Sequence, residues 1–196
     1  MRGKDVSTAF EAASQLSPHA ITVARDLLGM TLASVIGGAR VSGMIVETEA
    51  YLGVHDPASH AWRGRRHQLY QGIWAPDGSW YVYRSYGIHW CLNLTAPTED
   101  DGGAVLIRAV VPRDGLDVMR KRRGGVADSR LADGPGKLTQ AFGITGAHDG
   151  MRATRRAPIR LLPRREPIEE AQIVAGPRIG ISRAVDWPLR FSTPQP

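Results

Sequence analysis

The strongest constraint on the fold comes from two β-strand patterns that flank a pair of glycines at positions 37 and 38. Residues 31–36 and 41–51 are rich in apolar and β-branched side chains, and two glycines between such segments are typical of a hairpin turn. Because side chains alternate between the two faces of a strand, Glu49 and Tyr51 are predicted to point to the same side of the second strand.

Glu49 and Tyr51 make the first candidate site, and His60 follows Tyr51 by nine residues. A carboxylate beside an aromatic ring suits an enzyme that stacks a flat substrate on the ring and holds an acid or base next to it. Glu47 points to the same side and, on chemistry alone, competes with Glu49 for this role. The alternative is an ordinary strand with solvated glutamates.

The rest of the chain alternates short strands with short helices. Strands are predicted at residues 80–86, 88–94, 104–111, 159–162 and 189–191, and helices at residues 17–28, 114–123 and 137–142. Gly29 and Gly143 are the expected helix ends. Residues 53–79 hold few apolar runs, and so long a loop in a domain is often functional. Residues 1–16 are weakly patterned.

Charge, cysteine content and hydropathy limit the kinds of protein that this chain can be. The chain of 196 residues has 25 Lys and Arg against 19 Asp and Glu, and this net charge of +6 favours a polyanionic partner. The single cysteine, Cys91, excludes an internal disulfide and lies in an apolar run where a buried thiol is expected. The sequence contains no stretch of about 18 apolar residues, so no membrane span is predicted. The N-terminus lacks the apolar segment of a signal peptide.

Six short motifs follow one another along the chain: Glu49–Tyr51, His60, Tyr81–Gly87, Cys91–Asn93, Val105–Ala109 and Gly134–Leu138. In this order they resemble the signatures of the alkyladenine (3-methyladenine, methylpurine) DNA glycosylases, over residues 18–192. The resemblance implies one compact α+β domain, residues 17–196, with a curved, mainly antiparallel β-sheet flanked by short helices. It also implies a monofunctional enzyme of base excision repair that acts on double-stranded DNA.

Glu49 and Arg108 are the catalytic candidates. Cleavage of a purine N-glycosyl bond leaves an oxocarbenium-like sugar, and a carboxylate can stabilise that charge and deprotonate the attacking water. The resemblance, rather than the spacing, selects Glu49 over Glu47. Arg108 lies in an otherwise apolar strand, where a buried arginine requires a carboxylate partner. The resemblance implies that Arg108 helps to hold the water and Glu49, and a structural ion pair is the alternative.

The aromatic residues suit base flipping, in which one side chain fills the gap in the helix and others sandwich the extruded base. The resemblance assigns the wedge to Tyr86, at a predicted bend, while plain core packing of the tyrosines is the alternative. It places five residues around the base: Tyr51, His60, Tyr83, Asn93 and, through its backbone, Ile179. Asn93 would exclude guanine by a clash with the 2-amino group.

Contacts with the DNA backbone are expected from Arg63, Arg65, Arg66 and Lys137. Lys137 lies at a predicted helix start, where backbone N–H groups and a cation suit a phosphate. The nearby segment departs from the resembled family, which has a Thr-Pro-Arg-Asn run before a Met-Phe pair. This chain has His67–Tyr70 there, followed by Ile73-Trp74. The departure concerns DNA grip and lesion preference, not the catalytic pair.

The resemblance therefore predicts an enzyme that flips and hydrolytically excises alkylated purines of the 3-methyladenine and 7-methylguanine type, with hypoxanthine as a further candidate. We expect no cofactor and no metal, because the histidines near His60 lack the additional ligands of a zinc site. A monomer with no membrane attachment is expected, in the bacterial cytoplasm and nucleoid or, in a eukaryote, the nucleus. Two other classes stay open: a non-catalytic nucleic-acid-binding module whose aromatics stack on bases, and a hydrolase of free nucleosides or glycosides.

Overall fold

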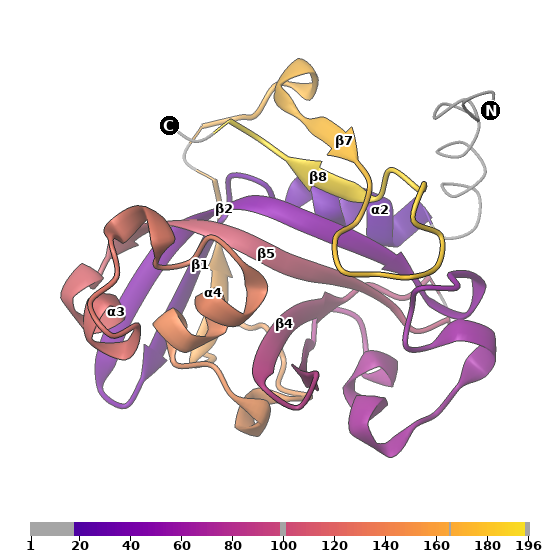
Figure 1. Cartoon of the computed structure of the whole chain (residues 1–196), viewed down its shortest axis with the longest axis horizontal. Helices are drawn as coiled ribbons and strands as arrows, with labels where there is room; N and C mark the ends of the chain where they lie inside the picture. Colours follow the sequence, from indigo (N-terminus) through magenta and orange to yellow (C-terminus); the bar gives the residue numbers. More distant parts are fainter. Residues whose placement is uncertain (1–17, 99–100, 165, 195–196) are drawn as a thin grey trace.

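A computed structural model describes residues 18–98, 101–164 and 166–194, which form an α+β fold of short helices around an antiparallel sheet (Figure 1). The helices are α2 (Pro18–Asp26), α3 (Leu116–Arg122) and α4 (Pro135–Phe142). The strands are β1 (Thr31–Ile36), β2 (Ala39–Leu52), β3 (Trp80–Ser85), β4 (His89–Thr95), β5 (Gly103–Asp114), β6 (Ile159–Leu162), β7 (Val174–Gly176) and β8 (Arg190–Ser192). The predicted weakly patterned segment 1–16 lies outside the described residues.

Strand β2 organises the sheet. Within the described residues, eight strands form one sheet in which β3, β4, β5, β2, β1 and β6 are neighbours in that order, and β8 pairs with both β2 and β7. Strand β2 pairs with β1 through its first half and with β8 near Glu47–Glu49. Its register with β5 shifts around Glu47, and such a bulge bends a strand and increases its twist. At the bulge, β2 changes its partner on one side from β1 to β8, and this change curves the sheet.

The main hydrophobic core lies between the sheet and the helices. Helix α2 packs on β2 and β5, while α4 packs on β4 and β5 and beside α3. Three large aromatic side chains, Trp80, Phe142 and Phe191, are fully buried there, and the Trp80 indole donates a hydrogen bond to the Ile159 carbonyl. None of the helices in the described part of the chain is long and apolar enough to cross a membrane.

The predicted elements are largely confirmed, with shifts at their ends. Helix α2 ends at Asp26 rather than residue 28, because the chain already turns toward β1 and the Gly29 amide donates to the Ile45 carbonyl. The glycine at position 143 adopts a left-handed conformation and ends α4, as predicted. Strand β7 has no counterpart in the prediction, since three residues, two of them exposed, are too few for a periodic pattern.

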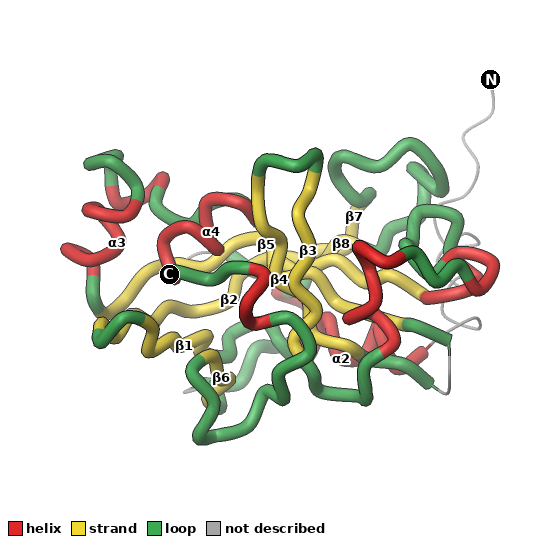
Figure 2. The backbone as a smooth tube through the Cα atoms, turned by 90° about the horizontal axis from the view of Figure 1, so that it is seen from below, coloured by secondary structure: helices red, strands yellow, loops and turns green. Residues whose placement is uncertain are grey.

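The long segment 53–79 is ordered by short 3₁₀ turns at Gly53–His55, Trp62–Gly64 and Gln68–Trp74. Part of it packs over the small buried cluster of Ala61, Ile73, Tyr81 and Ala104. In Figure 2 the β3–β4 hairpin and the loop after β7 project from the same side of the sheet. These irregular segments meet around one cavity.

The first prediction concerns Gly53, where β2 enters this segment. Gly53 has φ +61°, and an added Cβ would lie 1.8 Å from the Asp101 carbonyl oxygen, so the backbone would have to move. We expect Gly53→Ala to lower the free energy of unfolding by more than about 2 kcal/mol in urea denaturation. Gly37→Ala is the matched control, because Gly37 has φ +63° and no atom within 4 Å. It carries only the backbone strain, about 1 kcal/mol, so equal losses would contradict the steric argument.

Candidate active site

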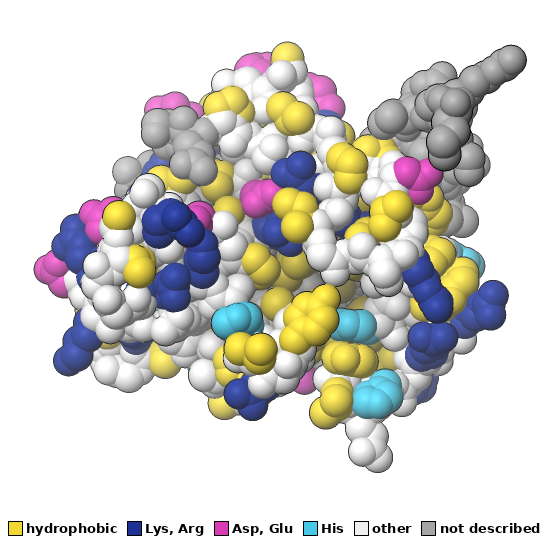
Figure 3. All heavy atoms as spheres, in the orientation of Figure 1, with side chains coloured by type: hydrophobic (Ala, Val, Ile, Leu, Met, Phe, Trp, Pro, Cys, Tyr) yellow, Lys and Arg dark blue, Asp and Glu magenta, His cyan; other side chains and the backbone are white. Residues whose placement is uncertain are grey.

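A cavity of about 870 Å³ opens where the irregular segments meet. Its walls come from β2, β5, the β3–β4 hairpin and three loop segments, which contribute Tyr51, residues 57–60, Arg65, Leu69, Tyr70, Ile73 and residues 179–183. Figure 3 looks onto this side of the molecule, where exposed hydrophobic side chains and histidines gather in the lower centre with Lys and Arg on both flanks. An apolar hollow between basic flanks suits a flat ligand attached to a polyanion.

Glu49 lies directly behind the cavity wall. Its side chain is fully buried, and its carboxylate accepts hydrogen bonds from the Ile179 amide (2.7 Å to Oε1) and the Tyr51 hydroxyl (2.9 Å to Oε2). One guanidinium nitrogen of Arg108 lies 3.2 Å from Oε1. Tyr51, Arg108 and Ile179 all border the cavity, so they connect the carboxylate to it.

Burial changes the proton affinity of this carboxylate. Loss of solvent raises the pKa of Glu49, while Arg108, the Ile179 amide and the Tyr51 hydroxyl lower it, and the net direction is upward. Burial and the neighbouring Glu49 also raise the pKa of Tyr51 well above its ordinary value, so the phenol keeps its proton and donates it. A carboxylate with a raised pKa is a stronger base than an exposed glutamate.

The two candidate carboxylates occupy different positions. Arg108 lies between them, because its Nε is 3.6 Å from Glu47 Oε1 while its terminal nitrogen faces Glu49. This confirms the predicted carboxylate partner for a buried arginine. Neither carboxylate lines the cavity itself. Glu47 also accepts a hydrogen bond from Arg190 at 2.9 Å, whereas Glu49 accepts those from the cavity residues Tyr51 and Ile179. Glu49 is therefore the carboxylate joined to the cavity wall, and Glu47 belongs to an ion pair behind it.

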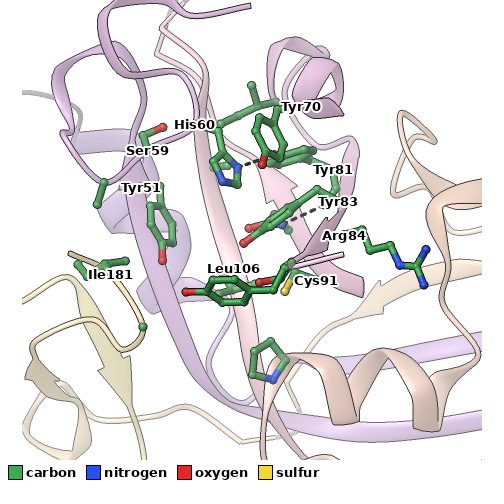
Figure 4. A pocket seen from close by; sticks show the side chains of 18 of the residues that line it. Tyr51, Ser59, His60, Tyr70, Tyr81, Tyr83, Arg84, Cys91, Leu106 and Ile181 are labelled. Carbon is green, nitrogen blue, oxygen red and sulfur yellow. Dashed lines mark hydrogen bonds between the residues drawn. The ribbon is translucent and has the colours of Figure 1, made fainter. Parts of the chain in front are cut away.

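Four aromatic rings line one end of the cavity (Figure 4). The His60 and Tyr70 rings are stacked, with centroids 3.8 Å apart and planes 7° apart. Tyr83 stands at 90° to His60 at 4.6 Å, and the Tyr81 hydroxyl lies 2.7 Å from His60 Nδ1. Tyr51 lies across the cavity from Tyr83 in Figure 4. Because His60 and Tyr83 already touch at a right angle, a base can enter between these two only if they separate.

The predicted base-binding residues do meet at one place: Tyr51, His60, Tyr83, Asn93 and Ile179 all line the cavity. Asn93 is buried, and its amide nitrogen donates to the Tyr81 carbonyl at 3.1 Å, which fixes the side chain. The Ile179 amide donates to Glu49, so this N–H is not available to a ligand, while the side chain of Ile179 is half-exposed. The roles of these residues toward a base stay predictions.

Tyr86 has the exposed position that the bend predicted. Its side chain is 86% exposed at the β3–β4 turn, lines the mouth of the cavity and has φ +50°, an unfavourable backbone conformation for a tyrosine. A large apolar ring held in solvent by a strained turn contributes nothing to the core. Core packing is therefore excluded for Tyr86, whereas Tyr81 is buried.

The basic residues divide into two groups. Arg63 stacks over Trp62, Arg66 stacks over Trp74, and Lys137 pairs with Asp133 at 2.8 Å. None of these three cations lines the cavity. Arg65 does line it, and so do two arginines that were not predicted, Arg84 and Arg183. Among the described residues, none of the three cavity arginines forms an ion pair with a carboxylate.

Sequence reasoning also missed the support beneath Tyr51. The Arg178 guanidinium lies under the Tyr51 ring, 4.6 Å from its centroid, and forms a bidentate ion pair with Asp56 in which both side chains are fully buried. It also donates to the Ala50 carbonyl at 3.0 Å. This pair fixes the loop that carries Ile179 against β2. Residues 122 positions apart leave no local signal, so only the fold reveals the contact.

Two further features bear on other chemistries. In the part of the chain that the structure describes, no group of three or more His, Cys, Asp and Glu side chains is arranged to hold a metal ion. Cys91 is buried, as predicted, and burial raises the pKa of its thiol, which disfavours the nucleophilic thiolate.

A buried carboxylate–arginine pair behind an aromatic, basic-rimmed cavity defines an enzyme that acts on a flat base carried by a polyanion. The sequence model of the methylpurine-DNA glycosylase family matches residues 14–196. A protein of Nitrosospira multiformis is 48% identical over 177 residues, which cover 89% of this chain and 86% of the relative. One of Agrobacterium fabrum is 50% identical over 172 residues, covering 88% and 82%. Both carry the name "putative 3-methyladenine DNA glycosylase".

The chain therefore belongs to the methylpurine-DNA glycosylase family, whose members are hydrolases of N-glycosyl bonds in DNA. This sets aside the non-catalytic binding module, and the placement of Glu49 against the cavity wall agrees with an enzyme.

The second prediction concerns the protonation of His60. Burial, with a smaller effect of His67, lowers the pKa of His60 to about 4 from an ordinary value of 6.5. In an NMR titration, the His60 ring signals, assigned with a His60→Gln variant, should shift with a midpoint near pH 4. The unfolded chain binds this proton at higher pH, so the stability due to neutral His60 is present above pH 6.5 and is lost as pH falls toward 4. A midpoint near 6.5 would mean that the ring is hydrated.

Proposed function

We propose that this protein is a monomeric DNA glycosylase that flips alkylated purines, of the 3-methyladenine and 7-methylguanine type, out of duplex DNA and hydrolyses their bond to deoxyribose. The observation that carries the proposal is the position of Glu49. Its carboxylate is held by Arg108, Ile179 and Tyr51, all of which face an aromatic cavity. A carboxylate in this position can act on the sugar of a nucleotide whose purine stacks in the cavity.

Glu49 acts on the water in this proposal. A water molecule that enters between Tyr51 and Arg108 takes the place of the Tyr51 hydroxyl at Glu49 Oε2. The water oxygen bonds to C1′ of the sugar, the bond from C1′ to the purine nitrogen breaks, and the base leaves with the electron pair. Glu49 accepts one proton of the water, and its negative charge stabilises the oxocarbenium-like sugar. Arg108 keeps Glu49 and the water in place.

The lesion itself supplies part of the driving force. A purine alkylated at N3 or N7 carries a positive charge in DNA and leaves as a neutral molecule, so no acid needs to protonate it. Hypoxanthine is neutral, and its release depends more on contacts with the cavity. We therefore place hypoxanthine below the cationic alkylated purines as a substrate.

Aromatic rings select and hold the flipped base. We propose that Tyr51 and Tyr83, which face each other across the cavity in Figure 4, stack on the base, with His60 at its edge. His60 stays neutral near pH 7, so it does not repel a cationic purine. Asn93, fixed by the Tyr81 carbonyl, disfavours undamaged guanine by a clash with its 2-amino group. 7-Methylguanine has the same amino group and is released because its positive charge makes it a good leaving group.

Tyr86 fills the space that the base leaves. Extrusion of a base costs a few kcal/mol of unstacking and unpairing, and a ring inserted into the gap prevents its return. Tyr86 is exposed at the cavity mouth, at the tip of a hairpin. A hydrolase of free nucleosides needs neither this exposed ring nor three cavity arginines that form no ion pair with a described carboxylate, so both features favour duplex DNA as the substrate.

The third prediction tests the function and its carboxylate together. A duplex with one 7-methylguanine is incubated with excess enzyme, and alkali cleaves the abasic product. We expect Glu49→Gln to slow base release by at least about 10²-fold, the usual contribution of a general base, while a gel-shift assay shows retained binding. Because Glu49 must be ionised, wild-type release should fall as pH drops through its pKa, which lies above the ordinary 4.5.

Glu47→Gln is the matched control for this experiment. It removes the charge of the carboxylate that pairs with Arg190 behind the wall, so a smaller loss is expected. A reversed order of the two variants would transfer the role to Glu47. Absence of base release from the wild-type protein on every lesion duplex would refute the proposed function.

The fourth prediction concerns the arginines at the cavity. If Arg84 and Arg183 bind phosphates of the flipped strand, Arg84→Gln and Arg183→Gln should each reduce the slope of log K against log salt by about 0.9. The control is Arg156→Gln, an exposed arginine just before β6, at the sheet edge opposite β3. Equal slopes for all three variants would remove both cavity arginines from the DNA interface.

A further inference from the structure

Tyr70 lies in the segment where this chain departs from the resembled family. Its ring is half-buried, lines the cavity and covers one face of His60 at a centroid distance of 3.8 Å. The run expected from the resemblance ends in an asparagine at the position of Tyr70. A short polar side chain there could not form this stack.

The ring separations show how the corner around Tyr70 is packed. The centroid distances are 3.8 Å for His60–Tyr70, 4.6 Å for His60–Tyr83 and 5.8 Å for Tyr70–Tyr83. These lengths form nearly a right triangle with its right angle at His60. Tyr83 is almost perpendicular to both rings, at 90° and 86°. The edges of His60 and Tyr70 therefore pack side by side against one face of Tyr83.

Other contacts hold the His60 and Tyr70 rings in place. His60 Nδ1 is held by the Tyr81 hydroxyl at 2.7 Å, and Tyr70 packs against the buried cluster that contains Ile73 and Tyr81. The His67 ring lies on Tyr70 at 5.3 Å. Tyr70 thus fills the room beside His60, on the side away from Tyr51 (Figure 4).

We propose that Tyr70 is a specificity-determining residue of this enzyme, whose ring closes the His60 corner of the cavity and sets an upper limit on the size of the purine that it accepts. Methylated purines fit within the limit, whereas a purine enlarged by a fused third ring, such as 1,N6-ethenoadenine, meets the Tyr70 ring. This inference rests on the proposed function.

The test compares two lesions in the full-length protein. Single-turnover base release is measured from duplexes that carry one 7-methylguanine or one 1,N6-ethenoadenine. Tyr70→Ala opens the corner and should raise the ratio of the ethenoadenine rate to the methylguanine rate by about tenfold or more. Tyr70→Phe keeps the ring and should leave the ratio within about twofold. Gln68→Ala, an exposed neighbour outside the cavity, is the control for the segment and should also leave the ratio unchanged.

A second measurement reports on the stack itself. In Tyr70→Ala the uncovered His60 ring becomes hydrated, so its NMR titration midpoint should rise from about 4 toward 6.5. If Tyr70→Ala is not folded, Tyr70→Asn, which carries the residue expected from the resemblance, removes the same ring and is assayed in its place.

The outcomes separate this inference from the proposed function. An unchanged rate ratio in Tyr70→Ala or Tyr70→Asn, an equal change in Tyr70→Phe, or an unmoved His60 midpoint would overturn the role of Tyr70, while methylguanine release by the wild-type protein would still support the proposed function. No release by the wild-type protein from either duplex would refute the function itself.

Discussion

The hydrogen-bonded carboxylate of Glu49 is the interaction on which the rest of the site depends. A buried charge is stable only when neighbouring groups replace its lost hydration, and here a guanidinium, a phenol and a backbone amide do so from three different parts of the chain. The same three residues border the cavity. The residues that stabilise the buried charge are thus the same residues that connect it to the cavity.

This arrangement around Glu49 requires both a bent sheet and a fixed loop. The bulge at Glu47 allows β2 to pair with β5 along its length and with β8 at one end, which brings Arg108 of β5 behind Glu49 and Arg190 of β8 beside Glu47. The Arg178–Asp56 pair then holds the loop that supplies the Ile179 amide. Breaking a buried pair on one side leaves an uncompensated charge, so this loop is strongly tied to β2.

The predictions from sequence succeeded where the signal was local. Alternation and glycine turns located β1, β2 and the β3–β4 hairpin to within a few residues, and the period of two placed Glu49 and Tyr51 on one side, where they form a hydrogen bond. The surroundings of the charged side chains were less evident from the sequence, and their predicted contacts with the DNA backbone stay predictions. Arg63, Arg66 and Lys137 looked equivalent to Arg65, yet of these four only Arg65 lines the cavity, while Arg63 and Arg66 lie over tryptophan rings and Lys137 pairs with Asp133.

By itself, the sequence determined the strands, the turn that exposes Tyr86 and the set of aromatic and charged residues available for a site. Each depends on neighbours a few positions away, and such interactions are encoded in short patterns. The tertiary structure alone decided that Glu49 rather than Glu47 is joined to the cavity, that Arg178 supports Tyr51 and that Tyr70 covers His60. These contacts depend on the curvature of the sheet and the packing of long segments, which no local pattern specifies.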